Sequence, residues 1–382
     1  MKRKSLFQSI YFMIISSIGG LVLSLAGLSI GWMIGTLLIA AFLSFKRPAF
    51  LKIPREQKGL PPYWLRIGQC ILAIELGQKI NLSVVHTFKD HWLVILVMLF
   101  LSIVFALISG LLLWKFSNTD MITSFFGTSP GGLSAMPSIA EEVGANTIVV
   151  TIIQTMRVFL VVLTIPLFAS TWSHHPANHV IANSDVVSSG GVSGFEWSYL
   201  LWTLILAFGV WGGYYIGKHL KFPAPWLVGG MLGVGCLQTL GSTFAGHDMI
   251  AWWPHSAIIL SQIFIASSIG SRFYKEMLTG IGKTMWVSLL TTIGLIVSML
   301  VCAYFVSIIT GISFITSMLA FAPGGIAEMA TTSAVLDADS TFVVVVQVLR
   351  VLVVCIVLPT MFRGLKQWEL RKVARTQSRI SA

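Results

Sequence analysis

Two glutamine–arginine pairs are the residues of this sequence best suited to bind an anion. Gln154 and Arg157 lie in one long apolar run, and Gln347 and Arg350 lie in another. Residues three apart share one face of a helix, and each arginine falls near the middle of its run. At the centre of a membrane an unpaired arginine costs at least about 2.5–3.5 kcal/mol. Because guanidinium is a permanent cation whose five donors suit carboxylate or phosphate, the pairs predict an anion-binding site inside the protein.

A structural role explains the same arginines equally well. Each arginine would then pair with an acid or hold the backbone carbonyls of a nearby turn. Two carboxylates are candidates for such a counter-ion, or for coupling to a proton or cation: Glu75, inside the third apolar run, and Glu328. Glu328 follows a Pro-Gly-Gly sequence whose first copy has Ala135 at the matching position, so this carboxylate is present in only one half of the chain.

Pro-Gly-Gly interrupts the apolar sequence twice. The first copy is Pro130, Gly131 and Gly132, within segment 117–146, and the second is Pro323, Gly324 and Gly325, within segment 310–340. Non-helical backbone at membrane depth is tolerated only where protein or a water-filled cavity satisfies its polar groups. We therefore predict that each segment is a re-entrant hairpin with a short helix beginning near its tip, where helix N-termini favour negative charge. The alternative is a surface loop with an ordinary turn.

The elements that must position these residues are membrane helices. The chain has 382 residues, of which 55% are apolar and 10% charged, and its mean hydropathy is +0.86. Soluble domains carry about 25% charged residues, so the composition indicates an all-α, multi-pass membrane protein. We predict ten transmembrane helices, at about 6–26, 27–45, 63–80, 92–114, 147–170, 198–217, 223–240, 256–271, 284–309 and 341–362. The first run continues directly into the second, which favours a membrane helix over a signal peptide.

The remaining composition argues against other classes of protein. The net charge of +11 reflects Lys and Arg in cytoplasmic loops, and no nucleic-acid-binding signature accompanies it. The four cysteines lie within apolar runs without a CxxC pair, and the eight histidines lie in loops or near helix ends. We therefore expect no metal site, no cofactor, no catalytic residue and no enzyme activity. The chain also lacks a nucleotide-binding Gly-rich loop followed by Lys-Ser/Thr, so ATP-driven pumping has no support.

The chain repeats itself after 193 residues. Matched residue types, which would rarely recur in order by chance, include Pro130 with Pro323, Gln154 with Gln347, Arg157 with Arg350, and Pro166 with Pro359. We interpret this as a tandem duplication. The predicted parts are a first repeat (1–170), a polar extracytoplasmic linker (171–197), a second repeat (198–363) and a basic cytoplasmic tail (364–382).

The orientation of the repeats follows from the number of crossings. Five crossings in each half would invert the second repeat relative to the first, whereas six would leave the two parallel. Five crossings put nearly all Lys and Arg on the cytoplasmic side and leave the linker, which lacks both, outside. Inverted repeats with broken helices that meet at the membrane midplane are typical of secondary transporters.

The motif order resembles the AbrB duplication family of bacterial membrane proteins. The resemblance rests on Ser-Pro-Gly-Gly-Leu-Ser-Ala-Met at 129–136, Gly-Ala-Asn at 144–146, Gln-Thr-Met-Arg at 154–157 and Pro166, and it covers about 6–363. In the family the first copy often has an acid after Gly-Ala, where this chain has Asn146; the second copy has Asp339 at the matching position. Some members are labelled regulators of gene expression, and others carry an old ammonia monooxygenase label. The resemblance implies the first label, and the second would need metal ligands that the sequence does not offer.

Together these features predict a secondary transporter of a small anionic organic solute in the bacterial inner membrane. The predicted partners are the lipid bilayer, the solute and a second copy of the chain in a homodimer, with both termini in the cytoplasm. The alternative is a membrane regulator or sensor that affects gene expression without transport. The short tail after Arg363 leaves little room for a signalling domain and favours the transporter.

Overall fold

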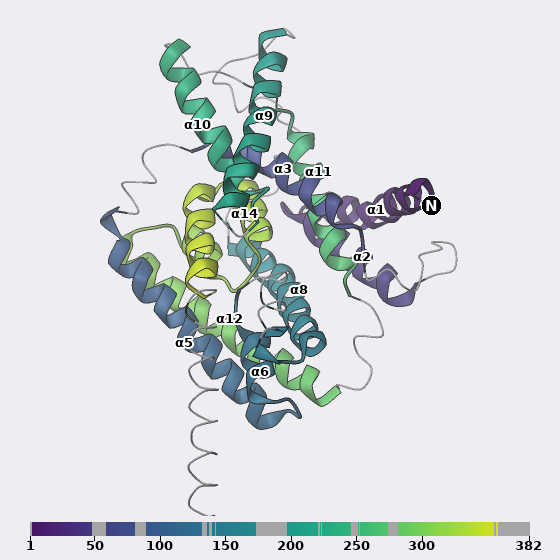
Figure 1. Ribbon diagram of the computed structural model, residues 1–382, viewed down its shortest axis with the longest axis vertical. Coiled ribbons are helices and arrows are strands. Elements are labelled where there is room, and N and C mark those ends of the chain that lie inside the picture. The colour runs from purple at the N-terminus through teal and green to yellow at the C-terminus, as the bar shows by residue number, and fades with distance from the viewer. Residues whose placement is uncertain are drawn as a thin grey trace, which may run out of the picture.

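The computed structural model is built from helices throughout the part of the chain it describes, and none of that part forms a strand (Figure 1). The described residues are 2–47, 59–80, 89–131, 136, 140–141, 143–172, 197–220, 222, 224–245, 251, 253–273, 282–354 and 357. The helices are α1 (Lys2–Leu25), α2 (Gly31–Lys46), α3 (Pro62–Gln78), α5 (Trp92–Phe116), α6 (Met121–Thr128), α8 (Thr147–Trp172), α9 (Trp197–His219), α10 (Val228–Ala245), α11 (His255–Gly270), α12 (Gly282–Thr310), α13 (Phe314–Phe321), α14 (Ile326–Val335) and a helix at Ser340–Val354.

Each predicted apolar run coincides with one of these helices. At the seventh run, predicted at 223–240, α10 begins only at Val228. The backbone there first makes turns, because Ala224 has a positive φ of 49° and Pro225 follows it. The tenth run is predicted to end at 362, and its helix is described as far as Val354, beyond which most residues lie outside the described part of the chain. Most of the predicted linker and the whole of the predicted tail lie outside the described residues.

Several helices have the length and composition of membrane spans. Within the described residues, the helices at Leu6–Leu25, Trp92–Phe116, Thr147–Trp172 and Gly282–Thr310 are long and apolar enough to cross a bilayer. Large apolar side chains also cover the outward faces of α5 and α12. Phe100 on α5 is 66% exposed, and Trp286 on α12 is 69% exposed. Such apolar surface on a well-packed helical protein indicates contact with lipid.

Six helices form a row in the order α1, α2, α11, α3, α10, α9, each packed against the next. Glycines allow the close contacts at both ends of the row. Gly35 of α2 lies against the backbone of Gly19 in α1, and Gly229 of α10 lies against the backbone of Gly213 in α9. At the centre, α3 and α11 run antiparallel, because Leu60 lies beside Ser271 while Gly68 lies beside Ile265.

A second group contains α5, α6, α8, α12 and α13. The first four of these helices are labelled in the lower half of Figure 1. Within this group, α5 and α12 also run antiparallel, because Ser102 shares a crevice with Met299 while Ser109 shares one with Thr291. The short helix α14 lies between the two groups and packs against α3, α8, α11 and α13. The two helical groups therefore meet around α14.

Candidate functional site

The first Pro-Gly-Gly follows the eight-residue helix α6, and the second joins the eight-residue helix α13 to the ten-residue α14. Helices of this length span about 12–15 Å, half of a bilayer core or less. Each begins at a polar N-cap: Asp120 accepts from Thr123 N at 2.9 Å, and Ser313 accepts from Thr316 N at 3.2 Å. The caps are 193 residues apart, so the two segments begin in equivalent ways.

Both segments return to the end at which they began. The backbone N–H of Asn146 donates to Thr123 Oγ1 at 2.9 Å, and that of Asp339 donates to Thr316 Oγ1 at 3.2 Å. The residues leaving each segment therefore lie beside its first turn, which makes both segments hairpins. Asn146 and Asp339 also cap the helices that follow, since their side chains accept from Val149 N and Phe342 N. An amide and a carboxylate serve equally well as N-caps, which explains why the repeats differ at this position.

The hairpin tips are buried within the protein. Pro130, Gly131 and Pro323 are buried, and Gly324 and Gly325 are partly so, which excludes a surface loop at these described positions. A side chain on Gly131 would collide with Met136, and the Cβ of an alanine at 324 would lie 3.0 Å from the methyl group of Met329. The small glycine residues thus let each tip lie directly against the methionine side chain of its own second arm. Gly132 lies outside the described residues.

The two glutamines hold the ends of the short helices. Gln154 Nε2 donates to the carbonyl oxygens of Phe126 at 2.8 Å and Ser129 at 3.4 Å. Gln347 Nε2 donates to those of Leu319 at 2.7 Å and Ala322 at 3.1 Å. The last carbonyls of a helix have no partner within the helix, so both glutamines satisfy groups that would otherwise be unpaired inside the protein.

The two arginines bind the next carbonyls of the same helix ends. Arg157 donates to Thr128 O at 2.8 Å, while Arg350 donates to Phe321 O at 3.5 Å, to Ala322 O and to Gly324 O at 3.0 Å. Arg350 also donates to Gln347 Oε1 at 2.5 Å. Both arginines therefore hold hairpin carbonyls, as the structural interpretation of the sequence predicts.

These carbonyls do not satisfy every N–H donor of the two guanidinium groups. Arg157 is 3% exposed and Arg350 is 2% exposed, and the Nε–H of each has no hydrogen-bond partner among the described residues. Within the described residues, both guanidinium groups donate to neutral acceptors. The site thus holds two buried cations, each with a donor that has no partner among the described residues.

Two crevices lie beside these arginines. The first is lined by Ser102, Pro130, Leu295, Met299, Phe321, Pro323 and Arg350, so it brings the prolines of both hairpin tips together. The second is lined by Ser109, Thr128, Ile153, Arg157, Thr291, Thr292 and Leu295. Their empty volumes are about 180 and 190 Å³, and neither has room for the centre of a water molecule. The hydroxyls of α5 and α12 in these walls were not predicted from the sequence. They are distinguished by their burial within helices whose other faces carry exposed apolar side chains.

The two candidate carboxylates lie away from the arginine crevices. Glu75 forms an ion pair of 2.8 Å with Lys79, one turn along α3. Glu328 is 7% exposed in the first turn of α14, with its carboxylate folded back over Gly325. Burial lowers the pKa of Arg272, and the charge of Glu328 opposes that shift. Arg272, just beyond α11, is therefore the cation whose charge acts on Glu328.

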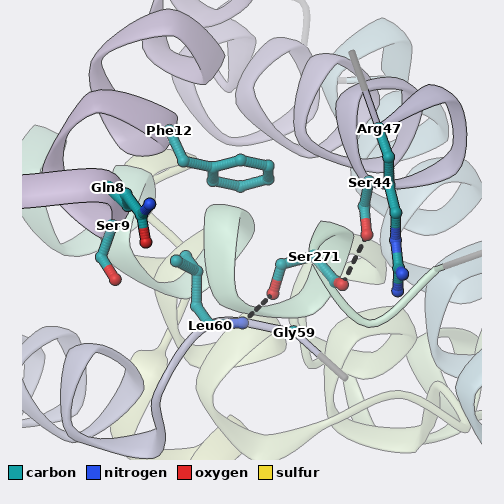
Figure 2. Close-up of a pocket in the computed structure, with 8 residues that line it drawn as sticks. All are labelled: Gln8, Ser9, Phe12, Ser44, Arg47, Gly59, Leu60 and Ser271. Carbon is teal, nitrogen blue, oxygen red and sulfur yellow. Dashed lines mark hydrogen bonds between the residues drawn. The ribbon is translucent and has the colours of Figure 1, made fainter. Parts of the chain in front are cut away.

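A larger cavity of about 410 Å³ lies elsewhere, among α1, α2, the residues before α3 and the end of α11 (Figure 2). Figure 2 shows Phe12 across the opening from Leu60, with Ser44 hydrogen-bonded to Ser271. None of the hairpin or arginine residues lines this cavity. It is therefore separate from the candidate site. The described residues also contain no group of three or more His, Cys, Asp or Glu that could hold a metal ion.

The long apolar helices, the apolar outer faces and the buried polar hairpins are those of a multi-pass membrane protein. The chain belongs to the AbrB family, whose model, described as "Transition state regulatory protein AbrB", matches residues 32–366. It is 52% identical over 362 residues to "Uncharacterized protein YhjN" of Bacillus subtilis (strain 168), covering 95% of this chain and 94% of that protein. It is 26% identical over 337 residues to "Putative regulator AbrB" of Escherichia coli (strain K12), covering 88% and 90% of the two chains.

Proposed function

We propose that the protein is a secondary transporter that carries a small organic anion across the bacterial inner membrane. The two buried guanidinium groups carry this proposal. A buried charge is stable only when it is paired or neutralised, and the described neighbours of Arg157 and Arg350 supply neutral acceptors. An anion that accepts from the two unpartnered Nε–H groups would satisfy both donors and neutralise the buried positive charge.

The proposed architecture consists of ten crossings in two inverted repeats, with the two hairpins entering from opposite faces. Helices that correspond at a spacing of 193 residues support it, because α3 and α11 run antiparallel, as do α5 and α12. If the two repeats had the same orientation in the membrane, corresponding helices that pack against each other would run parallel. The shared crevice of Pro130 and Pro323 supports a meeting of the tips near the midplane.

Transport requires the closed crevices to open. The hydroxyls of Ser102, Ser109 and Thr291 would then line a polar surface between α5 and α12. Glu328 is the stronger candidate for coupling to a proton, because it is buried beside a hairpin tip, whereas Glu75 already pairs with Lys79. Cycling of a buried carboxylate between charged and neutral forms is a common means of coupling within membranes.

Uptake by the purified protein in vesicles tests the proposal. A panel of carboxylates is offered with and without a proton gradient, and Arg157→Gln and Arg350→Gln should each abolish the uptake seen with wild type. Arg157→Lys should restore part of it, since lysine retains the charge and loses the planar fork. Arg66→Gln, on an exposed position of α3, is the matched control and should transport normally. Absence of uptake by wild type across the panel would instead favour the membrane regulator that the relatives' names suggest.

A further inference from the structure

Leu295 of α12 lies in the walls of both arginine crevices, and among the described residues it alone lines both. It is 4% exposed and belongs to the packed apolar core between α5, α8 and α12. The residue 193 positions earlier is Ser102, which itself lines the first crevice. A leucine thus separates the two arginine crevices, at a position where the other half of the chain has a small polar residue.

Each crevice contains one guanidinium with one unused donor. Arg350 lines the first crevice and Arg157 the second, and both Nε–H groups lack partners among the described residues. A single carboxylate at one arginine would leave the other cation buried and unpaired. A compact dianion would meet Leu295 before it could reach both arginines. Once the crevices widen, the ligand that would pair with both arginines has two negative groups held apart by a short apolar linkage.

We propose that the transported anion is a small dicarboxylate whose two carboxylates bind Arg157 and Arg350 while its carbon spacer lies against Leu295. This assignment rests on the proposed function and specifies its substrate class. Met299 extends the apolar wall beside the first crevice, and Ser102, Ser109 and Thr291 offer hydroxyls to the carboxylate ends. Leu295 sets how bulky the spacer can be, because its side chain occupies the space between the two charges.

Thermal stabilisation of the purified full-length protein tests the assignment without requiring transport. The probes are acetate, inorganic phosphate, malonate, succinate, glutarate, 2,2-dimethylsuccinate and the neutral succinamide, each titrated at one ionic strength. We expect one of the unbranched dicarboxylates to bind about tenfold or more tightly than acetate, because it forms a second charged hydrogen bond. Phosphate and succinamide should shift the unfolding temperature little.

Two variants test the separate roles of the arginine and the leucine. Arg157→Gln should remove the preference for dicarboxylates. Their affinity should fall about tenfold or more, toward that of acetate, because only Arg350 is left in the variant to bind a carboxylate. Leu295→Ala should improve the binding of 2,2-dimethylsuccinate relative to succinate, because the branched spacer then has room. Leu290→Ala is the matched control, since Leu290 is on the same helix but 63% exposed, and it should leave the order of affinities unchanged.

The outcomes separate this inference from the proposed function. Equal binding of acetate and the dicarboxylates, tightest binding of phosphate, or an unchanged order of affinities in Leu295→Ala would overturn the dicarboxylate assignment and leave an anion carrier in place. Failure of every anion to stabilise the wild type would overturn both proposals. If Arg157→Gln does not fold, Arg157→Lys replaces it. A dicarboxylate preference unchanged in Arg157→Lys, together with an unchanged order of 2,2-dimethylsuccinate and succinate in Leu295→Ala, then counts against the assignment.

Discussion

The hydroxyl of Ser44 donates to the carbonyl oxygen of Ser271 at 2.7 Å, although the two residues are 227 positions apart. Ser44 lies in the last turn of α2, and Ser271 immediately follows α11, so these two helices end on the same side of the protein. Five crossings in each half would put both helix ends in the cytoplasm, next to Arg47 and Arg272. Six crossings in each half would put them on opposite sides of the membrane. This contact therefore favours the inverted topology.

Labelling of introduced cysteines should reveal the inversion directly. Asp90 and Lys283 occupy equivalent positions 193 residues apart, both are exposed, and they precede or begin the equivalent helices α5 and α12. With Cys70, Cys236, Cys302 and Cys355 replaced by alanine, Asp90→Cys should react with an impermeant thiol reagent in intact cells. Lys283→Cys should react only after the membrane is opened. Reaction of both cysteines from outside would contradict the inverted topology.

Close packing of α9 against α10 predicts a sharp difference between two neighbouring glycines. A Cβ on Gly213 would collide with the backbone of Gly229, whereas one on Gly212 would meet nothing within 4 Å. Gly213→Ala should therefore destabilise the protein by about 1–3 kcal/mol through overpacking. Gly212→Ala should be neutral or slightly stabilising, because alanine favours the helix by about 0.5–1 kcal/mol. Thermal unfolding in one detergent compares the two variants, and equal losses would show that packing is not the cause.

The glutamine at each hairpin should contribute to stability through its amide donor. Gln347 is fully buried and its Nε2 serves the carbonyls of Leu319 and Ala322. Gln347→Leu removes that donor at similar volume and should cost about 1–3 kcal/mol for the carbonyls left unsatisfied. Faster amide hydrogen exchange confined to α13 and α14 would locate the effect. Unchanged exchange there would argue that the hairpin is held by Arg350 and by packing alone.

The local features of the site could be predicted from the sequence because they repeat. Pro323, Gln347 and Arg350 have counterparts in the first half, and recurrence of polar residue types in an apolar chain is hard to explain by composition. The helix breaks, the hairpins and the face shared by each Gln–Arg pair followed from that recurrence. The role of the arginines as carbonyl donors was one of two interpretations, since spacing along a helix does not reveal which backbone groups lie opposite.

Contacts between distant helices could not be predicted in the same way. α2 packs against α11 of the other half, and Leu295 separates the two arginine crevices. Both contacts depend on which helices pack closely against each other. Apolar and small residues occur in every helix of this chain, so their positions in the sequence do not identify the packing partners. The pairing of Glu75 with Lys79 was visible in the sequence as an i, i+4 spacing, but a carboxylate within an apolar run suggested a more distant partner.

The two hairpins end at residues whose side chains cap the next helix. Asn146 Oδ1 accepts from Ile148 N and Val149 N, both at 3.2 Å, and Asp339 Oδ1 accepts from Phe342 N at 2.9 Å. If these side chains act only as N-caps, exchanging them should cost little, and Asn146→Asp should be neutral or stabilising by about 0.3–1 kcal/mol because a carboxylate favours the helix N-terminus. Asn146→Ala and Asp339→Ala should each cost about 1 kcal/mol by removing the cap.

Thermal unfolding and vesicle uptake measured on the same preparations decide between capping and a part in ion coupling. Capping predicts that Asp339→Asn transports like wild type with the same dependence on the proton gradient. A carboxylate that carries the coupling ion could not be replaced by a neutral amide without losing that dependence. Loss of gradient-driven uptake in Asp339→Asn with stability retained would therefore transfer the coupling role from Glu328, at the tip of the second hairpin, to its exit.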